Sequence, residues 1–402
     1  MAVQGFPREL LEQPVSVRIH YFATKIVAHR RLKEAYDDLI HTIQHPAGTS
    51  LILAYGPTGV GKTTLRLRAE KQIAADAAAN PYADPGQVAY AGIDAAAVGG
   101  RYFEWKDYCF SGLKALDEPF LKDKVTYELH GIHRDEQGRL VIERKQVSTT
   151  DMWRVLLKTM IHRHPYAFFL DEAQHLKRVA SGQRLLEQMD ALKSFATMSK
   201  TLHVLLGNYE LLGLRNQSGQ LSRRTKEIHL PRYYANNEED LQEFIKVLLT
   251  FQRHLPLPEE PDLVSHYAYF YDQCLGCIGI LKDLLSRCLA AALEQEEPIL
   301  TADIWEKQAP TPGQMASIIE EILTGEEAFA KEEETLRKLR QQLKFPTINA
   351  VPEQPTSSPQ TDQSPQPTLP TEPPESSQKR RRRVGEQNPR RIRVGKGKEH
   401  VK

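Results

Sequence analysis

The feature that most constrains the fold of this chain is a glycine-rich loop that follows a short apolar segment. Residues 51–55 read Leu-Ile-Leu-Ala-Tyr, and the residues after them fit the pattern G-x-x-x-x-G-K-[ST] in full. The loop consists of Gly56, Pro57, Thr58, Gly59, Val60, Gly61, Lys62, Thr63 and Thr64. Its glycines allow successive backbone N–H groups to face an anion, and a following helix adds the positive end of its dipole. The pattern therefore predicts a strand, a phosphate-binding loop and a helix in succession.

Two side chains of this loop have expected roles in nucleotide binding. Lys62 would reach the β- and γ-phosphates, and the Thr63 hydroxyl would ligate Mg²⁺. The alternative is a glycine-rich turn that matches the pattern by chance. The apolar strand before the loop and the helix-forming run after it favour nucleotide binding.

A second motif is an apolar run that ends in two carboxylates. Residues 167–170 read Ala-Phe-Phe-Leu and precede Asp171 and Glu172. Asp171 is expected to support Mg²⁺ beside the nucleotide, and Glu172 to be the base that polarises the attacking water. Such a pair is common after strands, but here it follows a phosphate-binding loop. Together the two motifs predict nucleoside triphosphate hydrolysis.

Two further features indicate which kind of hydrolase this is. Asn208 ends another apolar run, residues 202–207, and is expected to hold the lytic water. Arg223 and Arg224 lie just before the apolar segment 226–230. One of them would stabilise transition-state charge in a neighbouring subunit as an arginine finger, although a solvated basic pair is the alternative.

The hydrophobic pattern predicts an α/β core, built as a parallel sheet with flanking helices, followed by an all-helical lid. The expected strands are residues 51–55, 88–93, 167–170, 202–206 and 226–230. The expected core helices are residues 30–45, 62–76, 150–163 and 184–198. A hairpin is expected near residues 122–147, with alternation at 125–129 and 140–142 around a turn at 135–138. The lid helices are expected at residues 238–251, 262–274, 280–293 and 312–343, with Thr301 and Thr311 as N-caps.

These patterns divide the chain into five expected parts. They are an N-terminal extension (1–27), the core (28–233), the lid with a C-terminal helix (234–345), a Pro-rich linker (346–378) and a basic tail (379–402). Nine prolines fall within residues 346–374, so this segment is expected to be an extended, disordered linker.

Composition excludes several classes of protein. No stretch approaches the roughly 18 apolar residues that a membrane span needs, so no membrane partner is expected. The first residues do not read as a signal peptide, and 4 cysteines in 402 residues make no disulfide framework. Cys274 and Cys277 have metal-like spacing, but no second pair follows, and buried lid cysteines are expected. A soluble intracellular protein is predicted.

The charge is segregated along the sequence. The whole chain has a formal net charge of +1, yet its last 24 residues hold eleven Lys or Arg against two Glu, a net charge of +9. The preceding residues therefore carry −8. A tail of this kind predicts an anionic partner such as DNA, or docking to a protein partner, over an inert solubility tail.

A second group of basic residues surrounds the expected hairpin. Their density would allow them to track DNA phosphates without reading sequence, although a solvated charged hairpin is an equal alternative. The candidates are Arg101, Lys106, Lys122, Lys124, Arg139, Arg144 and Lys145.

The motifs together resemble the AAA+ ATPases, and more narrowly the TnsC/TniB-type transposition regulators of Tn-seven-like or CRISPR-associated transposons. The resemblance covers about residues 28–300. The residues that carry it are Gly56–Thr64, Leu170-Asp-Glu-Ala-Gln-His175, Leu205-Leu-Gly-Asn-Tyr-Glu210, Leu221-Ser-Arg-Arg224, Leu230-Pro-Arg-Tyr233, Arg101-Tyr-Phe-Glu-Trp-Lys106 and Gly276-Cys-Ile-Gly-Ile-Leu-Lys282.

The resemblance implies an ATP- and Mg²⁺-dependent protein that assembles on double-stranded DNA as a ring or helical filament. It implies that the assembly links a TniQ/TnsD-like target-selection protein to a transposase, in the cytoplasm of a bacterium and associated with its nucleoid. Two alternatives are a helicase-loading or replication-initiation ATPase, and a nucleotide-gated DNA-binding scaffold with little hydrolysis. In one place the sequence departs from many AAA+ lids, because Gly279 stands where an arginine would contact the γ-phosphate and Lys282 is the nearest cation.

Overall fold

The computed structural model describes residues 5–81, 84–95, 104–118, 131–134, 140–143, 148–179, 183–215 and 223–343. The chain divides into residues 1–345 and residues 346–402. The expected linker and basic tail lie outside the described residues. The fold described below is therefore that of the first unit.

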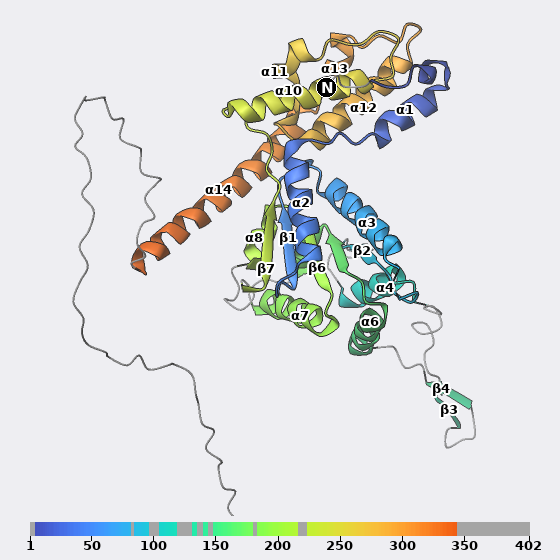
Figure 1. Cartoon of the computed structure of the whole chain (residues 1–402), viewed down its shortest axis with the longest axis vertical. Helices are drawn as coiled ribbons and strands as arrows, with labels where there is room; N and C mark the ends of the chain where they lie inside the picture. Colours follow the sequence, from blue (N-terminus) through green and yellow to red (C-terminus); the bar gives the residue numbers. More distant parts are fainter. Residues whose placement is uncertain are drawn as a thin grey trace, which may run out of the picture. The chain divides into compact units, whose positions relative to one another are not determined.

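The centre of the fold is a five-stranded parallel sheet in the order β2-β5-β6-β1-β7 (Figure 1). Its strands are β1 (Leu51–Tyr55), β2 (Tyr90–Asp94), β5 (Ala167–Asp171), β6 (Leu202–Gly207) and β7 (Thr225–His229). Every neighbouring pair is parallel. The carboxyl ends of all the strands therefore meet at one edge, where the segments after β1, β5 and β6 become neighbours.

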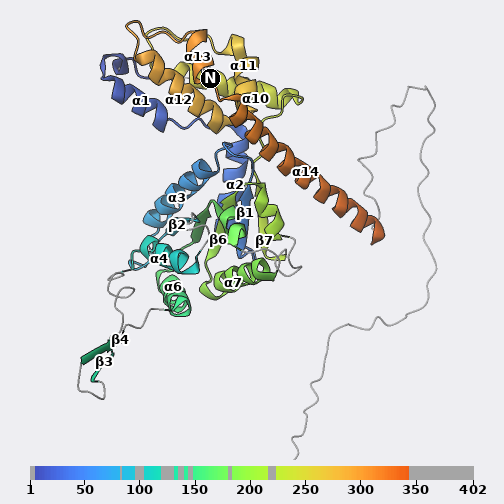
Figure 2. The same cartoon turned by 180° about the vertical axis from the view of Figure 1, so that it is seen from behind.

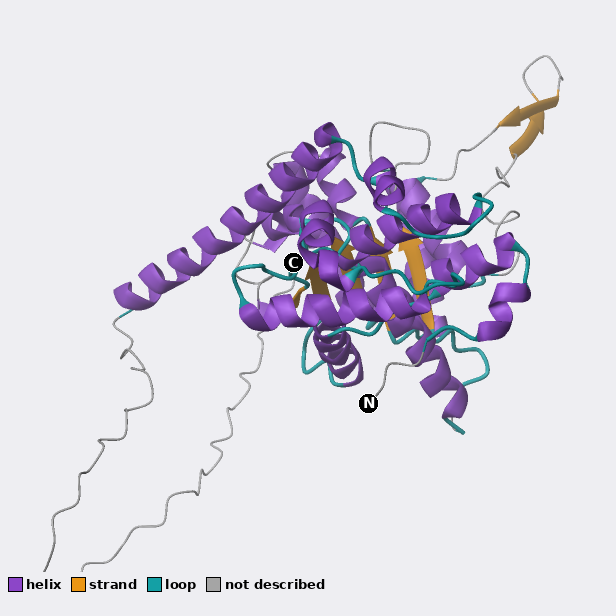
Figure 3. Ribbon diagram, turned by 90° about the horizontal axis from the view of Figure 1, so that it is seen from above, coloured by secondary structure: helices purple, strands orange, loops and turns teal. Residues whose placement is uncertain are grey.

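The two faces of the sheet are covered by different helices, as the alternation of side chains along a strand requires. Ile52 and Ala54 share a buried cluster with α2 (Arg30–Gln44) and α3 (Lys62–Ala79). Leu51 and Leu53 share another with α4 (Trp105–Ala115), α6 (Thr149–Arg163) and α7 (Gln183–Ser199). Figure 3 shows the strands enclosed between helices. Since both faces are covered, all five residues of β1 are buried, which is why the strand reads as a continuous apolar run.

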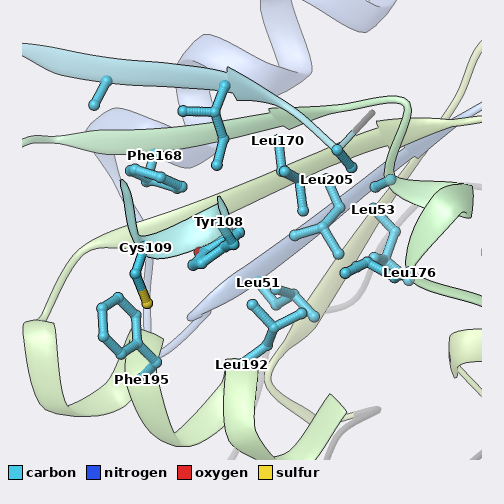
Figure 4. Packing of buried hydrophobic residues seen from close by; sticks show 14 of the residues in the cluster. Leu51, Leu53, Tyr108, Cys109, Phe168, Leu170, Leu176, Leu192, Phe195 and Leu205 are labelled. Atoms are coloured by element: carbon cyan, nitrogen blue, oxygen red, sulfur yellow. The ribbon is translucent and has the colours of Figure 1, made fainter. Parts of the chain in front are cut away.

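Leucine and aromatic side chains together fill the face that packs against α4, α6 and α7 (Figure 4). The rings of Tyr108 and Phe168 have centroids 5.8 Å apart, and Trp153 meets Phe195 edge-on at 4.6 Å. Burying a side chain of this size contributes about 1.5–3 kcal/mol. This packing fixes β5, and with it the carboxylates at its end.

The helices after the sheet form a separate core, which is the lid. They are α10 (Glu238–His254), η4 (Val264–His266), α11 (Tyr267–Cys274), α12 (Ile278–Leu293) and α13 (Ala302–Gln308). The N-terminal elements η1 (Arg8–Glu12) and α1 (Val15–Thr24) precede the core helices in sequence, and α1 packs beside α12 (Figure 2). Phe22 of α1 meets Phe251 of α10 with ring centroids 5.9 Å apart. The chain therefore builds the lid from both sides of the core sequence.

A long helix, α14 (Pro312–Gln342), follows the lid. Thr311 and Gln314 form a capping box at its start, with Pro312 at the first helical position, as the N-cap prediction required. Ile322 in its middle is buried, whereas Leu336, Leu339 and Leu343 near its end are exposed. The middle of α14 is therefore the part that packs on the rest of the fold.

Most predicted elements are confirmed, with shifts of a few residues at their ends. The helix expected at 262–274 is wrong in its first turn, because Asp262 caps the Ser265 N–H and η4 precedes α11. Of the expected hairpin, the structure describes the antiparallel strands β3 (Gly131–Arg134) and β4 (Leu140–Glu143). The alternating residues 125–129 lie outside the described residues.

Candidate functional site

The phosphate-binding loop connects β1 to α3. Gly59 and Gly61 have φ values of 78° and 103°, in the left-handed region that favours glycine. Gly61 is the N-cap of α3, and its carbonyl accepts from the Leu65 N–H at 2.9 Å. These two glycines of the motif therefore allow the chain to turn directly into the N-terminus of α3.

Lys62 folds back over the first residues of this loop. Its ammonium group donates to the carbonyl oxygens of Gly56 and Pro57, both at 2.9 Å. Burial lowers its pKa, and the negative charges of Glu172, Glu321 and Asp171 oppose that shift. A cation in this position is available to a bound polyphosphate.

A cavity of about 560 Å³ lies over the loop, and most of the residues predicted for nucleotide binding and hydrolysis line it. It is of the size that small ligands occupy in proteins. Its walls come from the loop, from the segments after β5 and β6, and from the lid. The lining residues are Ala23, Thr58, Gly59, Gly61, Lys62, Thr63, Thr64, Glu172, Gln174, Asn208, Gly279, Lys282, Asp283 and Ser286.

Glu172 is held by a neighbour that the sequence analysis missed. Its φ is 52°, an unusual value for a residue other than glycine. Gln174 donates to its carboxylate at 2.5 Å and accepts from the Asn208 N–H at 3.3 Å. The buried Gln174 amide therefore links the end of β5 to the end of β6. The signal that could have found it is its position two residues after a candidate catalytic acid.

Asn208 points its side chain along its own turn. Its Oδ1 accepts from the Glu210 N–H at 3.1 Å, which caps η3 (Tyr209–Leu211). The residue nevertheless lines the same cavity as Lys62. It lies where a polar group could hold a water beside the phosphates.

Asp171 is buried at the end of β5. One of its oxygens accepts from the Glu172 N–H at 3.0 Å, and the other lies 3.4 Å from an Arg66 nitrogen. Arg66 also pairs with Glu70 and Asp94, at 2.8 Å and 2.6 Å. Desolvation alone would lower the pKa of Arg66, but the hydrogen bonds that its guanidinium donates to Glu70 and Asp94 outweigh it and raise the pKa. This ion network fixes the Asp171 carboxylate.

The donor set around the loop fits Mg²⁺. Thr63, which carries a hydroxyl, lines the cavity. Asp171 supplies a carboxylate, and it directly precedes Glu172, which also lines the cavity. Mg²⁺ prefers oxygen donors and usually keeps water and substrate phosphates among its ligands. No group of three or more His, Cys, Asp or Glu that could hold a metal occurs among the described residues. The residues therefore suit an ion shared with a nucleotide rather than a cage made by protein side chains.

The lid touches the loop through backbone. The Gly279 N–H donates to the Gly59 carbonyl at 2.6 Å, and a Cβ at position 279 would lie only 2.5 Å from that oxygen. This close approach explains why no arginine stands at this position. Lys282, one turn later, lines the cavity and donates to the Ala23 carbonyl at 2.6 Å. Burial lowers its pKa.

A small hollow of about 50 Å³ adjoins the loop on the lid side. Apolar side chains of Val27, Phe251 and Ile278 line it together with His29. His29 bonds to the Tyr233 hydroxyl at 3.1 Å, and burial lowers its pKa to about 4. No sequence motif marks these residues, because an N-terminal segment and a lid helix meet there only in the fold.

Arg223 and Arg224 lie at the amino ends of the strands, opposite the end that carries the loop. The Arg224 carbonyl accepts from the N–H groups of Ser50 and Leu51, at the start of β1. At about 3.3 Å per residue, the length of β1 separates them from the loop by roughly 16 Å. The structure therefore does not bring these arginines into the cavity of their own chain.

The candidate DNA-binding residues fall mostly outside the described part of the chain. Lys106 is described and is exposed in the first turn of α4. The remaining candidates lie outside the described residues, namely Arg101, Lys122, Lys124, Arg139, Arg144 and Lys145. Cys274 and Cys277 are buried in the lid with free thiols, as expected.

Comparison with known proteins identifies the central part of the chain. Residues 44–214 match the family model described as an AAA domain. The parallel sheet with flanking helices has the AAA+ P-loop NTPase fold, in agreement with this match. No curated protein matches the chain.

Several solved structures are similar to this chain. One is the ORC2 protein of Aeropyrum pernix in ADPNP–ADP complexes, at 16% identity and a TM-score of 0.48, covering 72% of this chain and 70% of that one. Another is Cdc6p from Pyrobaculum aerophilum, at 14% identity and a TM-score of 0.47, covering 72% and 69%. A Walker-type ATPase of Pyrococcus abyssi is 14% identical, with a TM-score of 0.42 and coverage of 80% and 81%.

Within the described residues, no helix is both long and apolar enough to cross a membrane.

Proposed function

We propose that this protein is a Mg²⁺-dependent AAA+ ATPase that assembles on double-stranded DNA and regulates transposition. The observation that carries the ATPase proposal is the cavity over the loop. It gathers Lys62, Thr63, Glu172 and Asn208 from three adjacent strand ends. Phosphoryl transfer to water needs these groups around one point, because its catalysis consists mainly of positioning and charge stabilisation.

Each residue has a distinct part in this proposal. The backbone N–H groups of the loop and Lys62 hold the β- and γ-phosphates. Glu172 orients and polarises the attacking water, and Asn208 holds that water in line. A Mg²⁺ ion bound by Thr63, near Asp171, would neutralise charge on the phosphates. The apolar side chains beside His29, which adjoin the loop, would contact the base of the nucleotide.

Oligomerisation is proposed from the position of the arginines. Arg223 and Arg224 are exposed and lie a strand length from their own cavity. An arginine finger at this position would act on the site of a neighbouring subunit. A head-to-tail contact of this kind generates a ring or a helical filament.

The transposition role rests on the resemblance of the motifs to TnsC/TniB-type regulators. In this proposal ATP controls assembly on DNA, and the assembly links a target-selection protein to a transposase. Lys106, the basic residues around the hairpin and the basic tail would contact DNA phosphates. Replication initiation or helicase loading is the alternative, and a DDE-type transposase gene beside this gene would decide for transposition.

Glu172→Gln tests the hydrolysis mechanism. We expect phosphate release to fall about 100-fold, because a positioned general base contributes at least that factor. Affinity for a fluorescent ATP analogue should stay within about twofold, since the loop is unchanged. Glu306→Gln, an exposed carboxylate on α13, serves as the control for loss of charge. Unchanged turnover in Glu172→Gln would show the assigned base to be wrong.

Electron microscopy with duplex DNA and a non-hydrolysable ATP analogue tests the assembly. Rings or filaments around the duplex are expected with the analogue and not without nucleotide. Persistent monomers would contradict the proposal. Assembly by a wild-type protein that releases no phosphate would instead favour the nucleotide-gated scaffold.

A further inference from the structure

The middle of α14 lies directly against the phosphate-binding loop. Glu321 accepts from the Thr58 hydroxyl with both carboxylate oxygens, at 2.8 Å and 3.0 Å, and from the Thr58 N–H at 3.3 Å. Thr58 is the third residue of the loop, and it also lines the cavity over it. A carboxylate of the C-terminal helix therefore holds a residue of the nucleotide site.

Other contacts fix Glu321 in this position. Glu326, less than two turns later on α14, pairs with Arg232 at 2.8 Å and 3.2 Å. The ring of Phe329 lies 4.7 Å from that of His229, and Tyr209 packs against Gly325. Residues 321–329 thus contact the loop, the end of β7 and the residue after Asn208. The contact is built into the packing of the helix, unlike that of a mobile surface carboxylate.

The γ-phosphate of a bound nucleotide would lie on the side of the loop that Glu321 contacts. In the proposed site that phosphate lies between Lys62, Glu172 and Asn208. Asn208 lines the cavity over the loop and also a second groove, of about 610 Å³, whose other wall contains Glu321. Glu321 is also one of three carboxylates whose charge acts on Lys62. A third phosphate would bring further negative charge beside this carboxylate, and like charges repel.

We propose that Glu321 makes α14 a latch that senses the γ-phosphate. The latch is closed on Thr58 when the site is empty or holds a nucleoside diphosphate, and a nucleoside triphosphate releases it. Release frees Arg232 from Glu326 and exposes the face of α14 that carries Ile322 and Phe329. The inference rests on the proposed function only in requiring that the loop binds nucleotide.

Equilibrium binding of fluorescent ADP and of a fluorescent, non-hydrolysable ATP analogue to the full-length chain tests the latch. Glu321→Gln should bind the ATP analogue about tenfold more tightly than wild type, whereas ADP affinity should change by less than about twofold. Glu333→Gln removes the same charge from an exposed position further along α14 and should change neither affinity. Equal changes for the two nucleotides, or no change, would overturn the latch. Wild-type protein that binds neither nucleotide would overturn the proposed function as well.

Hydrogen exchange of the backbone amides in residues 318–329 gives a readout independent of affinity. In wild type, exchange should be faster with the ATP analogue than with ADP, because release loosens the helix. In Glu321→Gln the difference between nucleotides should disappear. If that variant does not fold, Thr58→Val removes the partner hydroxyl from the other side and should have the same effect. Equal protection with both nucleotides in wild type would reject the latch.

Discussion

Gln174 donates a hydrogen bond of 2.5 Å to the carboxylate of Glu172. Glu172 has a backbone φ of 52°, so its conformation is costly for a residue with a Cβ and has to be maintained by its surroundings. The other end of the same amide accepts from the Asn208 N–H. One buried side chain therefore sets the positions of both groups proposed to handle the attacking water.

Gln174→Ala is expected to lower the rate of ATP hydrolysis roughly ten- to hundredfold, because displacement of a catalytic group by about 1 Å can cost that much. Nucleotide affinity should change little, since Gln174 lies beyond the phosphate-binding loop in the cavity wall. Single-turnover hydrolysis and equilibrium nucleotide binding measure the two quantities separately. Gln72→Ala removes a comparable amide bonded to the exposed Asp76 on α3 and should leave the rate unchanged. An equal loss in affinity and rate would assign Gln174 a structural role.

Gly279→Ala tests whether the lid must touch the loop. The added methyl group would lie 2.5 Å from the Gly59 carbonyl oxygen, so the lid has to move away. We expect a loss of about 1–3 kcal/mol in the free energy of unfolding, as for other overpacked sites. Nucleotide affinity should fall about tenfold, because Lys282 and the hollow beside His29 move with the lid. Urea denaturation and fluorescent-nucleotide binding check the two effects.

Gly313→Ala is the matched control for this experiment. Position 313 lies in the first turn of α14, and a Cβ there meets no atom within 4 Å. Alanine in a helix is favoured over glycine by about 0.5–1 kcal/mol. The control should therefore gain stability while nucleotide affinity stays the same. A similar loss of affinity there would mean that the effect of Gly279→Ala is not specific to the contact between lid and loop.

The strands and the loop could be predicted because local sequence determines them. Residues 51–55 are buried on both faces and read as one apolar run, and Gly59 and Gly61 occupy backbone conformations that favour glycine. His29 and Glu321 could not be predicted in this way. Each acts through a contact between segments far apart in the sequence, up to 263 residues for Glu321 and Thr58. No local periodicity or motif contains such a contact.

The helix α1 was missed for a related reason. It begins after Pro14 with no side-chain cap, so no start signal marks it. Its stability comes from packing, since Phe22 is fully buried against the lid and Arg18 donates to the Pro256 carbonyl at 3.0 Å. An amphipathic segment of this length is marginal as a helix until it has a partner surface.

Stability should fall as the solution is acidified below pH 6.5, in part because of His203. This ring is buried between Phe168 and Phe195, and burial lowers its pKa from 6.5 to about 4. The unfolded chain takes up the proton first as the pH falls, so the contribution is fully present above pH 6.5 and is lost toward pH 4. The loss is at most about 1.4 kcal/mol per pH unit. Urea denaturation between pH 7 and pH 5 measures it.

The variant His203→Leu isolates this contribution. It should reduce the slope of the unfolding free energy against pH, by up to the amount that one bound proton contributes. This reduction is expected whatever the effect of the substitution on stability at pH 7. Phe168→Leu changes the same packing, because the ring centroids of Phe168 and His203 are 5.3 Å apart. It removes no titrating group. It should lower stability and retain the wild-type slope. An unchanged slope in His203→Leu would mean that the ring does not titrate differently in the folded protein.

The position of Arg223 and Arg224 leads to a complementation experiment. Glu172→Gln lacks the base in its own cavity, whereas the double variant Arg223→Ala/Arg224→Ala would lack the group supplied to its neighbour. Each protein by itself should hydrolyse ATP at least about 100-fold more slowly than wild type. In an equal mixture on DNA, roughly one quarter of head-to-tail contacts would join an intact cavity to an intact arginine pair. Phosphate release should therefore recover to about that fraction of wild type.

An inactive mixture, despite joint assembly, would exclude an arginine acting between subunits. Testing Arg223→Ala and Arg224→Ala separately then identifies the finger, because the one that loses activity without losing assembly supplies charge rather than contact.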